Sequence, residues 1–189
     1  MIARSRVVAA VLAILLVTAA AIAYRLSDPD TDSELVRAPL DEPTSFQTGQ
    51  VRVSDVRVGS TISQGDDRHS TSGLFVVVSV AVRAVGRDAV SVPSSQLLSE
   101  EGVTYLPASS LSVRADPGFE TSRDLVFEVD PSRIDDLTLE LWNQGLTYRY
   151  YERTQTPLGI TSANARRWVE AGQGRTVVVQ RSEVTRALP

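Results

Sequence analysis

The spacing of hydrophobic residues changes along the chain, and each change marks a different kind of predicted element. Residues 7–23 form an uninterrupted apolar run, the pattern of a helix that is apolar on all sides. Residues 24–48 are rich in proline and acids and have no hydrophobic period, so they predict a solvated linker. From Gly49 onward apolar and polar residues alternate in short runs between turn residues, which is the pattern of β-strands.

Residues 49–160 carry this alternation and predict one all-β domain, an antiparallel β-sandwich of roughly seven or eight short strands. Residues 75–82 are almost continuously apolar and predict a central strand that is buried on both faces. Within residues 51–58 the alternation of valines slips by one position, which indicates a β-bulge. The polar residues 60–73 predict a loop.

A hairpin is predicted near the end of the sandwich. Alternate leucines in residues 137–141 predict an inward strand face, which places Glu140 and Trp142 on the outward face. Residues 143–145 contain a glycine at the position that favours a left-handed conformation, so they predict a three-residue hairpin loop. Residues 146–151 then predict the returning strand.

Residues 161–189 follow the predicted sandwich as a C-terminal extension. A short helix is predicted through residues 164–171, with Ser162 as its cap. Residues 175–181 predict a strand. Two arrangements stay open: the strand pairs with an edge of the sandwich, or the whole extension is loosely held.

Charged residues on either side of the apolar run predict its orientation in a membrane. Arg4 and Arg6 precede the run and several acids follow it, so the positive-inside rule places the N-terminus in the cytoplasm and the domain outside. As a helix, the run measures about 26 Å, a short but workable span of the bilayer core. An uncleaved anchor in residues 1–23, giving a single-pass protein of the cell membrane, is favoured over a signal peptide. The alternative is supported by the small residues at Ala21 and Ala23, after which a signal peptidase can cut.

Several segments of the predicted sandwich resemble a known family. They are the first strand from Gly49, the strand at 74–80, the hairpin from Leu97 to Tyr105, the turn at 117–120 and the strand at 125–129. Together they resemble the immunoglobulin-like domain-of-unknown-function family of exported Gram-positive proteins, which is similar in fold to a small secreted immunogenic antigen of actinobacteria. The resemblance implies an immunoglobulin-like sandwich behind an anchor or signal and a linker, and it implies no chemistry. The chain departs from the family pattern at 85–87, where such domains often carry an asparagine.

The amino-acid composition excludes several kinds of active site. The chain of 189 residues has no cysteine and one histidine, so it has no disulfide, thiolate nucleophile or cysteine-ligated metal. Its net charge of −4 argues against non-specific binding to nucleic acid. The single histidine, His69, is the only imidazole base, and it is expected to be exposed in the polar loop. No cofactor and no metal are predicted, because no motif for either is present.

Acidic pairs are the remaining candidates for catalysis. Asp66-Asp67, Glu100-Glu101 and Asp135-Asp136 are each adjacent in the sequence, and adjacent strand residues point to opposite faces. They are therefore expected to be solvated turn residues, and the protein is expected not to be an enzyme. A carboxylate-dependent hydrolase stays as an alternative, which would need two acids facing each other across a deep pocket.

Aromatic residues near the last predicted hairpin indicate a surface for a partner. Trp142, Arg149 and Tyr151 are expected on outward strand faces, and these residue types are enriched in protein-binding sites. The alternative is that Trp142 packs against the sandwich. We therefore expect a non-enzymatic, membrane-anchored extracytoplasmic domain that binds a cell-envelope protein or has a structural role in the envelope. A soluble secreted antigen or ligand-binding protein, cut after Ala23, is the alternative.

Overall fold

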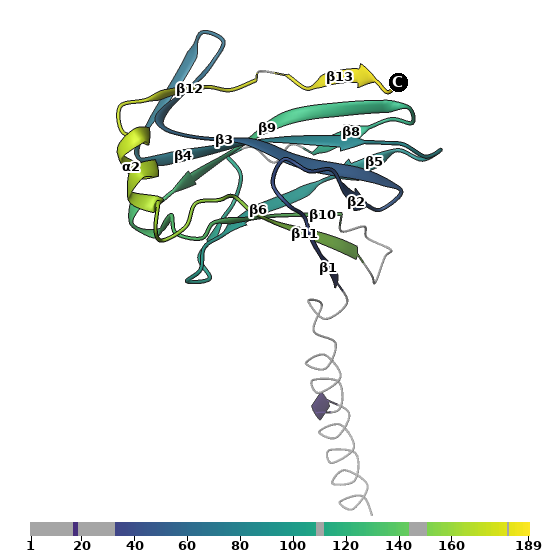
Figure 1. Cartoon of the computed structure of the whole chain (residues 1–189), viewed down its shortest axis with the longest axis horizontal. Helices are drawn as coiled ribbons and strands as arrows, with labels where there is room; N and C mark the ends of the chain where they lie inside the picture. Colours follow the sequence, from purple (N-terminus) through teal and green to yellow (C-terminus); the bar gives the residue numbers. More distant parts are fainter. Residues whose placement is uncertain (1–16, 19–32, 109–111, 144–150, 181) are drawn as a thin grey trace, which may run out of the picture. The chain divides into compact units, whose positions relative to one another are not determined.

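The computed structural model describes residues 17–18, 33–108, 112–143, 151–180 and 182–189. The chain divides into two compact units, Met1–Ser33 and Glu34–Pro189, and the second unit is a β-sandwich (Figure 1), as predicted. Its elements in chain order are β1 (Ser33–Arg37), β2 (Thr44–Phe46), β3 (Gly49–Gln64), β4 (Asp67–Arg83), β5 (Val90–Val92), β6 (Ser94–Leu98), β7 (Thr104–Tyr105), β8 (Val113–Ala115), β9 (Phe119–Val129), the 3-10 helix η2 (Pro131–Arg133), β10 (Thr138–Trp142), β11 (Tyr151–Pro157), α2 (Ala165–Gly172), β12 (Thr176–Val178) and β13 (Val184–Ala187).

Two sheets lie face to face. The large sheet has the strand order β12-β3-β4-β9-β13, with β2 beside β3, and the small sheet has the order β1-β11-β10-β6-β7. The central strands β3, β4 and β9 pair antiparallel, whereas β12 runs parallel to β3. In Figure 1 the large sheet lies above the small one.

The main core fills the space between the two sheets. β4 supplies Val76 and Val78, β9 supplies Phe127 and the small sheet supplies Leu139, all of them fully buried. The residues of β4 that alternate with the core valines are largely buried too, on the opposite face. The prediction of a central strand buried on both faces is therefore confirmed.

The predicted β-bulge is present in β3. The register of β3 on β4 shifts between Ser54 and Arg57, and Asp55 adopts a positive φ of 52°. The extra residue sets the face to which the following side chains point. Arg57 therefore reaches the outer face of the large sheet, where its guanidinium meets Ser79 and Asp124.

The polar segment 60–73 is not a loop, so that prediction is wrong. β3 and β4 continue through it as a hairpin arm (residues 61–70), and their pairing runs on to Gln64 and Asp67 at the tip. β12 lies beside the β3 strand of the arm, and Ile62 packs against an apolar cluster on the outer face of the sheet. Ile62 is the single apolar residue of the arm, so the sequence shows no hydrophobic alternation there.

The sandwich begins before Gly49, which corrects the predicted linker at 24–48. β1 joins the small sheet beside β11, and β2 pairs with β3 in the large sheet. β2 also places Phe46 in the main core, where it is fully buried. Both strands are short and mostly solvated, so they leave almost no hydrophobic period in the sequence.

Among the described residues, no helix combines the length and the apolarity that crossing a membrane requires. The apolar run 7–23 lies outside the described residues except for Val17 and Thr18, which are helical. The signal anchor and the cleaved signal peptide therefore both stay predictions.

The last hairpin differs from its prediction. Trp142 pairs with Arg153, whereas a three-residue loop at 143–145 would place Leu146 opposite Trp142. The register of β10 on β11 therefore excludes a three-residue loop at 143–145. The predicted returning strand 146–151 lies outside the described residues except for its last residue.

Alternate leucines of β10 face the core as predicted, but the outward-facing Glu140 is not exposed. It is only 2% accessible. Its carboxylate accepts hydrogen bonds from the side-chain amides of Gln96 on β6, at 2.6 Å, and Gln155 on β11, at 2.7 Å. These amides lie on the two strands that flank β10, so the burial of Glu140 cannot be predicted from the sequence of β10 alone.

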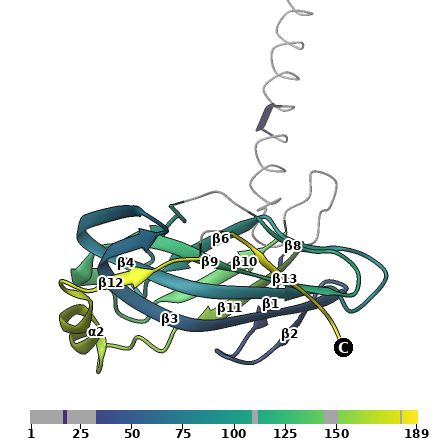
Figure 2. The same ribbon diagram turned by 90° about the horizontal axis from the view of Figure 1, so that it is seen from above.

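The C-terminal extension folds against the sandwich, which decides between the two arrangements left open. α2 follows Asn164 rather than Ser162, and β12, within the predicted strand 175–181, pairs with β3. β13 pairs with β9 and was not predicted. Because β12 and β13 occupy opposite edges of the large sheet, the strap between them (residues 179–180 and 182–183) lies across its outer face (Figure 2).

Candidate functional site

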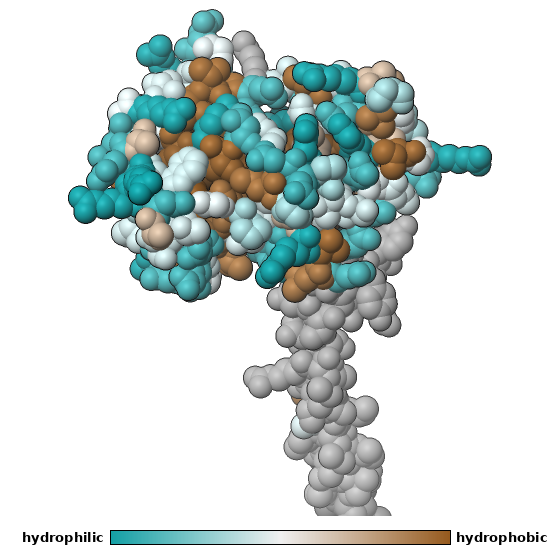
Figure 3. All heavy atoms as spheres, viewed as in Figure 1, coloured by the Kyte–Doolittle hydropathy of each residue, from teal (hydrophilic) through white to brown (hydrophobic). Residues whose placement is uncertain are grey.

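The outer face of the large sheet carries a second apolar cluster, separate from the main core. Phe75 and Val77 of β4 and Val126 of β9 form its base, because they alternate with the residues that face the core. Val177 and Val179 of the C-terminal extension pack on this base. Figure 3 shows apolar side chains, in brown, that reach the surface below the tip of the hairpin arm.

A hollow of about 340 Å³ lies on this outer face. Its lining residues come from the hairpin arm, β4, β9, the strap and the segment after β7, namely Ile62, Gln64, His69, Phe75, Ala108, Arg123, Asp124, Val126, Val179 and Gln180. Half of these residues are apolar and half are polar or charged, and small-ligand sites combine apolar walls with polar groups that orient the ligand. This hollow, named here the outer groove, is the candidate binding site.

Asp124 contributes to the lining of the outer groove and has a carboxylate that is almost completely buried. Its side chain is 1% exposed. Oδ1 accepts a hydrogen bond from the Ser79 hydroxyl at 2.6 Å and lies 2.8 Å from Nη2 of Arg57. Oδ2 accepts a hydrogen bond from the backbone N–H of Gln180 at 2.9 Å. The carboxylate therefore ties β3, β4 and the strap to β9.

The pKa of Asp124 is lowered from its ordinary value. Burial by itself raises the pKa, but the hydrogen bonds from Ser79, Gln180 and Arg57, together with the charge of Arg57, outweigh burial. The group is therefore a carboxylate at neutral pH, and the strap is held by a charged acceptor.

This pKa shift predicts how stability depends on pH. A carboxyl group with a lower pKa in the folded state stabilises the fold above its unfolded pKa of about 4, and that contribution is lost as the pH falls through the folded pKa. We predict that the free energy of unfolding falls less steeply below about pH 4 in Asp124→Asn than in the wild type. Urea unfolding across this pH range measures it, and two parallel curves would contradict the assignment.

Further contacts fasten the strap and β12 to the hairpin arm. The amide of Val179 donates to the carbonyl of Ser63 at 2.9 Å, and the side-chain amide of Gln64 donates to the carbonyl of Gln180 at 3.3 Å. Gly59 makes this approach possible, because a Cβ there would come within 2.7 Å of the Arg175 carbonyl oxygen. β3 therefore holds Val179 and Gln180, the two strap residues that line the outer groove, in place.

His69 lies on β4 in the hairpin arm, opposite Ile62, rather than in a loop. It is exposed, as expected, and it contributes to the rim of the outer groove. Among the described residues no hydrogen bond or ion pair to His69 is found, so its imidazole has no fixed orientation there. This arrangement suits contact with a ligand better than general base catalysis, which needs a fixed geometry.

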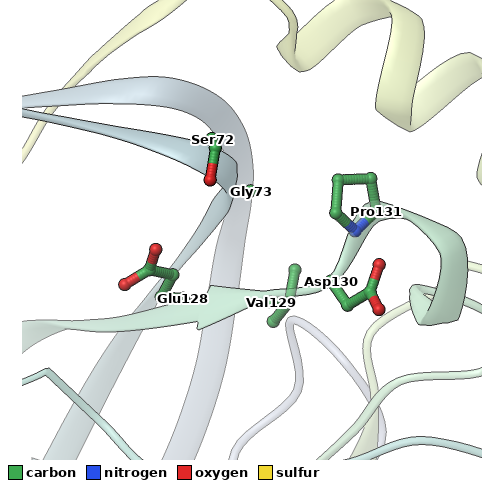
Figure 4. A pocket seen from close by; sticks show the side chains of 6 residues that line it. All are labelled: Ser72, Gly73, Glu128, Val129, Asp130 and Pro131. Carbon is green, nitrogen blue, oxygen red and sulfur yellow. The ribbon is translucent and has the colours of Figure 1, made fainter.

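A second hollow, of about 400 Å³, contains two acids, Glu128 and Asp130 (Figure 4). Their side chains lie on either side of Val129 and point apart. The hydroxyl of Thr71 donates to Glu128. Asp130 accepts hydrogen bonds from the hydroxyl and backbone N–H of Ser132 at 2.7 and 2.9 Å, and these bonds lower its pKa. Both carboxylates are thus already hydrogen-bonded in an open hollow, and nothing here favours the hydrolase alternative.

The three predicted acidic pairs lie on different turns. Asp66-Asp67 and Glu100-Glu101 are exposed, and Asp135-Asp136 are half-buried. The described part of the chain brings no three histidine, aspartate or glutamate side chains together in a way that could hold a metal ion.

The predicted aromatic patch is described only in part. Trp142 is half-buried, and the guanidinium carbon of Arg153 lies 5.1 Å from the centre of its ring. This cation–π contact occupies one face of the indole. Arg149 and the side chain of Tyr151 lie outside the described residues, so the patch stays a prediction.

The fold and the outer groove define a β-sandwich protein with a candidate ligand site on one sheet. No family model matches the chain, and no curated protein sequence matches it. The chain is similar to the solved yjhA protein from Bacillus subtilis, with 12% identity and a TM-score of 0.42, over 80% of this chain and 98% of that chain. It is also similar to an uncharacterized beta-sandwich protein from Clostridium difficile 630, with 7% identity and a TM-score of 0.45, over 67% of this chain and 95% of that chain. The expected resemblance to the immunoglobulin-like family therefore rests on the sequence segments alone.

Proposed function

We propose that this protein is a non-enzymatic binding module of the cell envelope, which takes its ligand in the outer groove. The outer groove carries the proposal, because it is a hollow with both apolar and polar lining residues on a sheet face that the main core does not use. The exposed His69 and the amide of Gln64 add polar groups at its rim.

We also propose that residues 1–23 anchor the module in the membrane, with the sandwich outside the cell. The arginines before the apolar run and the acids after it support this orientation. Two antiparallel layers around one core support an immunoglobulin-like type for the sandwich.

The location is tested by fractionating cells that make a C-terminally tagged full-length chain. We expect the tagged protein in the membrane fraction, with an N-terminus before the apolar run when it is read by mass spectrometry. A soluble protein that begins at Tyr24 would overturn the anchor and support the secreted alternative.

The binding surface is tested by photo-crosslinking in living cells. A photoreactive amino acid replaces His69 at the outer groove, and the matched control replaces Arg87 in an exposed turn. We expect a crosslinked product from position 69 and none from position 87. A third variant at Trp142 tests the predicted patch, and a product from that position alone would move the binding site away from the groove.

A further inference from the structure

β13 contributes far less to the fold than the other edge strand of the large sheet. β12 buries Val177 in the outer apolar cluster. Three of the four residues of β13 are exposed, and only Val184 is half-buried. Since β13 adds no residue to either apolar cluster, it is held mainly by its backbone pairing with β9.

Some side chains at β13 make close contacts with the edge of β9, and others leave their neighbours on β9 uncovered. Glu183, just before β13, makes an ion pair with Arg123 at 3.0 Å, and the hydroxyl of Thr185 lies 3.2 Å from that of Thr121. The next residue on this face, Ala187, is opposite Phe119, which stays 40% exposed.

A hollow of about 340 Å³ lies along this seam. Its lining is mostly polar: Arg114, Asp116, Thr121, Glu183 and Thr185 surround Phe119, the single apolar residue among them. Apolar surface is therefore left uncovered only at Phe119, which lies opposite Ala187, and larger aliphatic groups at 185 and 187 would cover more of this ring. At the edge of β9, Glu183 therefore complements Arg123 well, whereas Thr185 and Ala187 cover the residues opposite them poorly.

The edge of β9 does not depend on β13 for its own place in the sheet. β9 pairs with β4 from Glu120 to Val129, and Phe127 and its neighbours hold it in the main core. If β13 leaves this edge, the backbone donors and acceptors of β9 become available for pairing with another strand.

We propose that the edge of β9 at residues 119–123 is a strand-addition site for an extended segment of a partner protein, with an acid opposite Arg123 and aliphatic residues opposite Thr121 and Phe119. β13 is the weak internal occupant of this site. Backbone pairing would supply affinity, and alternate side chains would supply specificity, as in other cases of strand addition. Arg123 also lines the outer groove, but the peptide measurements report on the edge of β9 and the crosslink at position 69 reports on the groove, so each proposal has its own test.

Three fluorescent octapeptides and the full-length protein in detergent test the proposal. The first has the sequence of residues 182–189, Ser-Glu-Val-Thr-Arg-Ala-Leu-Pro. The second, the filled peptide, carries the equivalents of Thr185→Ile and Ala187→Leu. The third is the filled peptide with the equivalent of Glu183→Lys. We expect the filled peptide to bind about tenfold more tightly than the first, and the third to bind about fivefold more weakly than the filled one.

Two measurements show that the peptide occupies the edge of β9. In Arg123→Glu the preference between the filled and the charge-reversed peptide should invert. If that variant does not fold, Arg123→Gln should remove the preference. Hydrogen exchange with the filled peptide bound should rise at 184–187, while residues 119–122 stay protected.

Equal binding of the three peptides would overturn the proposal. So would unchanged exchange at 184–187 with the filled peptide bound. Tighter binding of the first peptide than of the filled one would also overturn it, because the site would then prefer the C-terminal strand of a second copy of this chain.

Discussion

Asp124→Asn is expected to lower the free energy of unfolding by about 3 kcal/mol. The carboxylate accepts from Ser79, Arg57 and the backbone of Gln180 while it is 1% exposed. An asparagine amide keeps one acceptor oxygen and places an NH₂ group against these donors. The charge of Arg57 would then lose its buried partner, and the hydrogen bond from Gln180 of the strap would lose its charged acceptor.

The matched control is Asp55→Asn, which removes the other carboxylate of Arg57. Asp55 lies 3.0 Å from Nε of Arg57, but its side chain is 61% exposed, so the loss should stay below about 1 kcal/mol. Asparagine also tolerates the positive φ of this position. Urea unfolding at pH 7 compares the two variants, and equal losses would show that the buried carboxylate has no special role in holding the strap.

Phe127→Ala is expected to have the largest effect, a loss of about 3–5 kcal/mol. Phe127 is fully buried in β9 and is among the largest side chains of the main core. Truncation removes its apolar contacts and leaves a cavity that the surrounding strands fill only in part. A protein of this size that loses so much stability should unfold at a clearly lower urea concentration.

Phe119→Ala on the same strand is the control for Phe127→Ala. Phe119 is 40% exposed at the edge of β9, so its loss should cost about 1 kcal/mol or less. Comparable losses in the two variants would mean that the space between the sheets is not the principal core.

The sequence predicts the parts of the fold in which one strand face is buried and the other is not. The slip of the valines in 51–58 indicates the bulge in β3, and the alternate leucines in 137–141 indicate the core face of β10. The hairpin arm and β1 cannot be predicted in this way, because their few apolar residues set up no hydrophobic period. Their existence depends on backbone pairing with strands that are already in place.

The candidate site is harder to predict, because its residues meet from distant parts of the chain. Asp124 alternates with buried residues of β9, so the local pattern indicates a solvated outward side chain. Its burial depends on Arg57, placed by the bulge, and on Gln180 in the strap. Glu140 is a similar case, because Gln96 and Gln155 cover it from two other strands. No single segment of the sequence carries this information.

The early start of the sandwich limits how far the proposed module reaches. Because β1 begins at Ser33, only residues 24–32 remain between the apolar run and the first strand, and nine extended residues span at most about 30 Å. A linker running to residue 48 would have allowed more than twice that distance. If residues 1–23 anchor the chain as proposed, this short linker would keep the module close to the bilayer, where a partner in the same membrane would have a high effective concentration. Distant layers of the envelope would then be out of reach.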